Sequence, residues 1–128
     1  MIAIKTLAGP EVLVDPQSVT RVAGPRPHDA GPHTYLDCAA GTLVTAETPE
    51  ALLARIAAKP PLSQLTRPDG TPVWIKGSAI GSIRPPVASE AEGAGDVNAI
   101  LTIDGQHQAV RETVASVRAL VEAVGKAG

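Results

Sequence analysis

Two segments, Gly9–Val14 (GPEVLV) and Gly70–Ile75 (GTPVWI), decide how this sequence of 128 residues is interpreted. Each has a glycine before an apolar run, and 61 positions separate the two segments. At the same spacing, Val19–Val22 falls on Ile80–Ile83. A turn and an apolar run that recur at a fixed spacing are typical of an internal repeat. The sequence therefore predicts that one structural unit occurs twice.

Later positions also match, at an offset that grows because of insertions in loops. The matches are Leu36 with Ile100 and Gly41 with Gly105 at an offset of 64, Glu47–Thr48 with Glu112–Thr113 at 65, and Leu52 and Ile56 with Val117 and Val121. The alternative is chance similarity between two segments rich in Ala and Val. The order of the elements, the glycine turns and the apolar spacing all agree between the two segments, which favours a repeat. We expect a first unit at 1–58, a linker at 59–61 and a second unit at 62–128.

Each unit has the pattern of short strands followed by one helix, which predicts an α+β fold. Ala40–Gly41 and Asp104–Gly105 are the turns of two hairpins, because such pairs between apolar runs favour tight turns. The predicted hairpin strands are Thr34–Cys38 with Thr42–Ala46 and Ala99–Ile103 with Gln106–Val110. We expect two similar β-rich units, each of about four short strands plus one C-terminal helix, packed as one pseudo-symmetric body. A unit of about 60 residues is marginal alone, which favours joining the two apolar faces.

Both predicted helices have recognisable ends. Thr48 is a natural N-cap, with Pro49 at the first helical position and Pro60–Pro61 as the stop. Thr113 caps the second helix, and Gly125 suits its C-terminal cap. The residues expected to face the core are Leu52, Leu53 and Ile56 in the first helix and Val114, Val117, Leu120, Val121 and Val124 in the second.

The order of these features resembles the small flagellar-operon (FlbD-type) family. The carriers in the first copy are Val14–Pro16, Val19 with Val22, Gly41 and Glu47–Thr48, and those in the second are Leu65–Arg67 with Gly70, Ile80 with Ile83, Gly105 and Val110–Thr113. The two copies cover nearly the whole chain, whereas family members look like single units. Lys76–Gly77 replaces the Asp-Pro pair in the second copy. The resemblance implies a fold and a flagellar setting, and it supplies no catalytic residues.

Composition excludes several classes of protein. The single Cys cannot form an internal disulfide, and no uncharged apolar run approaches the roughly 20 residues of a membrane span. Met1–Lys5 lacks the basic region and apolar stretch of a signal peptide. We therefore expect a soluble, cytoplasmic protein without a membrane partner.

Charge argues against general binding of nucleic acid. The net charge is −2, with four basic and six acidic residues in the first 58 and seven of each in 59–128. Nucleic-acid binders concentrate Lys and Arg on one face, and single-strand binders add aromatic platforms. Tyr35 and Trp74 are the only aromatic residues here. A small local site is the alternative left open.

Contacts with a protein partner are expected at two loops rich in Pro and Gly, Ala23–His33 and Arg84–Asp96, although tolerated insertions are the alternative. The candidate contact residues are Trp74, Arg26, His28, His33 and Arg84. Strand alternation points Trp74 away from its neighbours Val73 and Ile75, either outward to a partner or under the other unit.

Motifs for chemistry are sparse, so no catalytic, cofactor-binding or metal-binding residues are assigned and no cofactor is expected. His28, Asp29, His33, Asp37 and Cys38 are suitable zinc ligand types, but they lack the tight paired spacing of a zinc site. Cys38 with His33 or His107 has no accompanying signature of a nucleophile. Glu47 and Glu112, just before the two helices, are expected to interact favourably with the positive helix ends.

The sequence favours a non-enzymatic interaction module, an adaptor or structural component of a bacterial or phage assembly, with a protein partner or self-association along exposed strand edges. The candidate edges are Ile2–Lys5 and Thr34–Cys38. The first alternative is a regulatory nucleic-acid-binding module of flagellar type. The second is a small enzyme with an unrecognised site.

Overall fold

A computed structural model describes residues 1–24, 33–38, 41–57, 62–68, 70–87, 97–103 and 105–127. The predicted linker at 59–61 lies outside these residues. Most of each predicted contact loop also lies outside the described residues, at 25–32 and 88–96.

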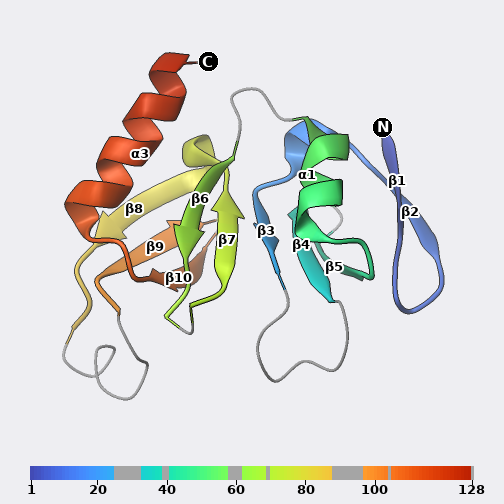
Figure 1. Ribbon diagram of the computed structural model, residues 1–128, viewed down its shortest axis with the longest axis horizontal. Coiled ribbons are helices and arrows are strands. Elements are labelled where there is room, and N and C mark those ends of the chain that lie inside the picture. The colour runs from blue at the N-terminus through green and yellow to red at the C-terminus, as the bar shows by residue number, and fades with distance from the viewer. Residues whose placement is uncertain are drawn as a thin grey trace.

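The described residues form a mixed α+β fold with ten strands and two α-helices (Figure 1). The first half contains β1 (Ile2–Lys5), β2 (Glu11–Val14), the 3-10 helix η1 (Pro16–Ser18), β3 (Arg21–Ala23), β4 (Thr34–Cys38), β5 (Gly41–Thr45) and α1 (Pro49–Ile56). The second contains β6 (Ser63–Thr66), β7 (Pro72–Ile75), the 3-10 helix η2 (Gly77–Ala79), β8 (Ile80–Arg84), β9 (Ala99–Ile103), β10 (Gln106–Val110) and α3 (Val114–Ala127).

The expected number of about four strands per unit is too low by one, since each half has five. β3 is the shortest strand of the first half and spans three residues.

The strands form three antiparallel sheets. One contains β1 and β2, one has the order β10-β9-β8, and the largest has the order β5-β4-β3-β7-β6. The largest sheet takes strands from both halves, because β3 pairs with β7 in the register Arg21–Ile75, Val22–Trp74 and Ala23–Val73. We call this β3–β7 pairing the junction.

Backbone contacts connect the first hairpin of each half to the last strand of the same half. In the first half Thr6 bridges to Thr45, and Leu7 N donates to Val44 O at 2.9 Å. In the second half the N–H of Arg111, just after β10, donates to Thr66 O at 2.8 Å. These contacts bring the end of β1 close to β5 and the end of β6 close to the residue after β10, but they add no strand pairing to the three sheets. Among the described strands β1, β2, β5, β6, β8 and β10 therefore each pair with one strand only.

Each half encloses its own apolar core. The buried residues of the first core are Ile4, Val14, Val19, Val22, Leu36, Leu52, Ile56 and Trp74. Those of the second core are Ala23, Leu65, Val73, Ile75, Ala99, Leu101, Ile103, Val110 and Val117. Trp74 and Ala23 each belong to the core of the other half, so the junction packs both cores together.

The helix starts agree with the sequence prediction. Thr48 Oγ1 accepts from Ala51 N and Thr113 Oγ1 from Ser116 N, both at 3.2 Å. α1 ends at Ile56, followed by Ala57 in the left-handed conformation.

Two predictions about α3 are wrong. The helix continues through Gly125 to Ala127, because glycine weakens a helix without forcing it to end. Leu120 is 39% exposed, whereas Val117 is fully buried in the second core. Val121, one position further along, still packs against the second core, so the face of α3 that contacts the core is narrower than the apolar spacing predicted.

Replacing Thr48 with alanine is expected to lower the free energy of unfolding by about 1 kcal/mol, since the Ala51 N–H loses its acceptor. Urea unfolding followed by circular dichroism measures this change. Thr48→Ser is the matched control, because serine keeps the hydroxyl and should retain most of the stability. Equal stability of wild type and Thr48→Ala would contradict the capping role.

Within the described residues, no helix has both the length and the apolar character needed to cross a lipid bilayer.

Candidate functional site

Trp74 lies at the centre of the junction, directly opposite Val22. Strand alternation holds along β7, because Val73 and Ile75 face the second core while Trp74 packs in the first. Trp74 is only 9% exposed. Of its two predicted placements, the structure shows burial under the other half, so its side chain does not lie on an outer surface.

A polar group centred on Arg21 also connects the halves. Arg21 Nε lies 2.5 Å from Asp37 Oδ2, and its Nη1 and Nη2 donate to Gln108 Oε1 at 2.9 Å and Gln106 Oε1 at 3.1 Å. Asp37 Oδ1 accepts from Thr42 Oγ1 at 2.6 Å. Because all three guanidinium nitrogens have partners within the protein, this group acts as a structural link between β3, β4 and β10.

Two small hollows share Arg21, Asp37 and Thr42 in their walls. One of them also includes Cys38, but it contains no histidine. The Cys38 thiol donates to Gly41 O at 3.5 Å, within its own hairpin. The Cys-His pair that nucleophilic catalysis needs is therefore not assembled in this hollow.

A buried cation, Arg67, lies next to the junction and was not identified from the sequence. It is 5% exposed, and its Nη2 donates to Gly24 O at 2.7 Å while its Nε donates to Thr71 Oγ1 at 2.6 Å. A lone arginine after a strand usually lies at the surface, so only the fold reveals its burial. Arg67 ties the β6–β7 turn to the end of β3.

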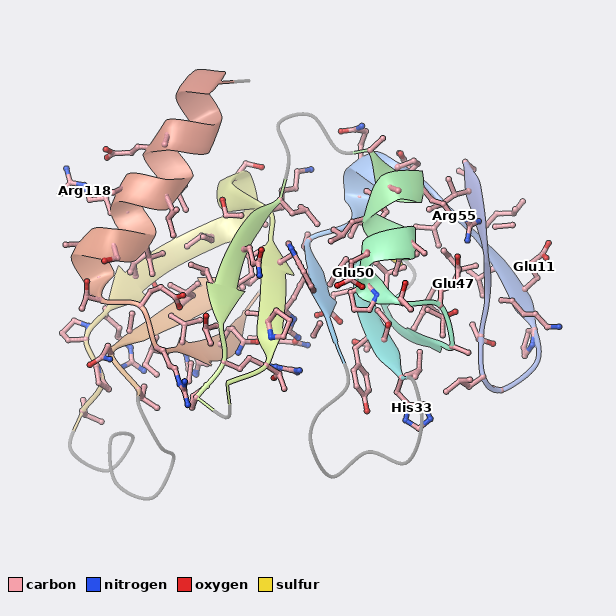
Figure 2. The ribbon with its side chains drawn as sticks, in the orientation of Figure 1. Glu11, His33, Glu47, Glu50, Arg55 and Arg118 are labelled. Atoms are coloured by element: carbon pink, nitrogen blue, oxygen red, sulfur yellow. The ribbon has the colours of Figure 1, made fainter. Side chains whose placement is uncertain are left out.

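Each glutamate that precedes a helix accepts hydrogen bonds from a group beyond the first turn of that helix. Glu47 accepts from Arg55 Nη1 at 2.7 and 2.6 Å, and Arg55 also donates to Ala3 O (Figure 2). Glu112 Oε1 accepts from Thr66 N at 2.9 Å. The sequence predicted that both carboxylates interact with the positive helix ends. The structure shows, in addition, that each accepts a hydrogen bond from a group outside the helix backbone.

Of the remaining predicted contact residues, the structure describes His33 and Arg84, which lie in different halves. His33 is half-buried immediately before β4 (Figure 2). Arg84 ends β8, where its Nη1 donates to Pro85 O at 3.3 Å. Arg26 and His28 lie outside the described residues, as does Asp29 of the zinc ligand types. In the part of the chain that the structure describes, no group of three or more His, Cys, Asp or Glu side chains could hold a metal ion.

The strongest candidate for a contact surface is the outer edge of β2. The predicted edge at Thr34–Cys38 is wrong, because β4 pairs with β3 on one side and β5 on the other. Among the described strands, β2 is hydrogen-bonded to β1 alone. Leu13, at the position in β2 that Trp74 has in β7, is 65% exposed. Val12 and Val14 beside it pack on the first core. The edge of β2 therefore presents a large apolar side chain beside backbone groups that can pair with another strand.

The outer edge of β8 is the second candidate, because β8 pairs with β9 alone among the described strands. Ile83 is half-buried and packs against the second core, while Gly81 and Ser82 are exposed. Both edges are suited to strand addition, in which backbone hydrogen bonds supply affinity and apolar side chains supply specificity.

Comparisons of the chain with protein family models, curated proteins and solved structures found no match.

Proposed function

We propose that this protein is a non-enzymatic interaction module that binds protein strands at its exposed sheet edges, as an adaptor or structural component of a bacterial or phage assembly. The observation that carries the proposal is the edge of β2, where Leu13 is 65% exposed on a strand paired on one side only. Apolar side chains on an unprotected edge favour pairing with another strand.

We also propose that the chain arose by duplication of one unit, and strand registers support this. β1–β2 pairs Ile2 with Val14 and β6–β7 pairs Ser63 with Ile75, so both positions shift by 61. The pairs of β4–β5 and β9–β10 shift by 65, as in Thr34–Thr45 and Ala99–Val110. A one-residue difference in register would place opposite faces inward, so this agreement is informative.

The same turn also recurs between the strands of the two first hairpins. Thr6 N donates to Pro10 O at 3.1 Å, and Arg67 N donates to Thr71 O at 2.8 Å. Both members of the second pair lie 61 positions after those of the first. The shared turn and registers support two copies of one fold. The relation to the flagellar-operon family and a cytoplasmic location remain proposals that rest on the sequence alone.

A photo-crosslinking amino acid at position 13, introduced into the protein in its native cells, tests the function. We expect a covalent adduct with a discrete protein, whether another protein or a second copy of this chain. Leu120 is the matched control, since it is an exposed apolar residue on α3, outside every strand of the three sheets. Equal or absent crosslinking at both positions would refute the proposed use of the β2 edge.

A further inference from the structure

The open edges of β2 and β8 are the sequence counterparts of the two edges that form the junction. β3 and β7 each pair with one strand of their own half and bond to each other, whereas β2 and β8 bond only to β1 and β9 among the described strands. At the offset of 61, β2 corresponds to β7, and β3 corresponds to β8. Figure 1 shows β2 and β8 on opposite sides of the molecule.

The junction therefore indicates how the outer edges can pair. In the junction Val22 lies opposite Trp74, and both are buried in the first core. The counterparts of these two residues are Ile83 and Leu13. Ile83 already packs against the second core, but Leu13 is 65% exposed and has no facing strand among the described residues. Both members of the corresponding pair are apolar, as in the junction.

We propose that a second copy of this chain adds its β2 to β8 in the antiparallel register of the junction, with Leu13 of one copy opposite Ile83 of the next. Val14 then lies opposite Ser82, and Val12 opposite Arg84. This inference rests on the proposed function, because it names the partner of the exposed edges.

The chemistry of β2 and β8 supports this pairing. Leu13 of one copy covers Ile83 on the second core of the next, as Trp74 covers Val22 on the first core. The central positions of β2, Val12–Val14, carry no charge, and its acidic residue Glu11 lies at one end of the strand. Inward charges are a common device against edge pairing, and β2 lacks one at its centre.

The proposed contact is head-to-tail, because it joins different strands of the two copies. Such an interface leaves one β2 and one β8 free at the ends of each assembly, so association continues into a ring or a filament. It is weaker than the junction. Arg21, which bonds Gln106 and Gln108 across the halves, corresponds to Ser82, which cannot reach as far.

Light scattering on the purified full chain tests the proposal by complementation. The wild-type mass is expected to rise above 13.0 kDa with concentration, whereas Leu13→Glu and Ile83→Glu alone should each remain at 13.0 kDa. An equal mixture of the two variants should give a species of twice that mass, because each supplies the intact edge that the other lacks. Ser82→Glu is a second variant of β8 that preserves the packing of Ile83, and Leu120→Glu is the control at an exposed apolar residue outside both edges.

Each alternative outcome overturns this proposal. A wild-type mass of 13.0 kDa at every concentration excludes self-association. Continued association of Leu13→Glu alone, or of Ile83→Glu and Ser82→Glu alone, shows a symmetric or unrelated contact instead. The proposed function is tested separately by crosslinking. If position 13 crosslinks to a different protein while the wild type is monomeric, strand addition stands and self-association does not.

Discussion

Replacing Trp74 with alanine is expected to lower the free energy of unfolding by about 3–5 kcal/mol, the range measured when a buried large aromatic side chain is truncated. Trp74 is 9% exposed and packs in the first core although it belongs to the second half. Its loss leaves a cavity where the two halves meet. Urea unfolding followed by far-ultraviolet circular dichroism measures the change without relying on tryptophan fluorescence.

Leu13→Ala is the matched control for this experiment, because Leu13 occupies the corresponding position in β2. It is 65% exposed, so its truncation should change stability by no more than about 0.5 kcal/mol. Similar losses for both variants would contradict the burial of Trp74 and the contrast between the two edges. The difference between the two variants thus measures how much burial at the junction contributes to the free energy of unfolding at this strand position.

Local structure was predictable from the sequence where local chemistry determines it. The hairpin strands Ala99–Ile103 and Gln106–Val110 have the predicted boundaries, and Thr48 caps α1 as expected. A turn dipeptide or a capping hydroxyl acts within a few residues, so its effect can be inferred from those residues alone.

The junction could not be predicted in the same way. Nothing in the three residues of β3 indicates that they pair with β7, 50 to 54 positions later in the chain. Alternation did predict that Trp74 points away from Val73 and Ile75. Whether solvent or the other half covers that face depends on tertiary packing, which the pattern of one strand does not contain.

Alignment of the two halves by sequence was also shifted by one position in β4. Matching Gly41 to Gly105 pairs Leu36 with Ile100, but the strand registers pair Leu36 with Leu101. Leu36 and Leu101 are both fully buried. Glycine supplies a positive φ at slightly different points of the two hairpin turns, so matching the glycines shifts the strands.

Replacing Arg67 with alanine is the second large effect that we expect, a loss of about 2–3 kcal/mol in the free energy of unfolding. Arg67 is 5% exposed and donates to Gly24 O and Thr71 Oγ1. Removing the guanidinium leaves a buried carbonyl without this donor, and an unsatisfied buried polar group costs about 1–3 kcal/mol. The loss of the packed aliphatic stem adds to that cost.

Two further variants separate these contributions in the same urea measurement. Arg67→Met keeps an apolar stem of similar length, so it should recover the packing part of the loss and leave the hydrogen-bonding part. Arg118→Ala removes an arginine whose side chain is 74% exposed, and it should change stability by no more than about 0.5 kcal/mol. If Arg67→Ala were as stable as Arg118→Ala, Arg67 could not hold the β6–β7 turn against β3, and the junction would depend on its apolar residues alone.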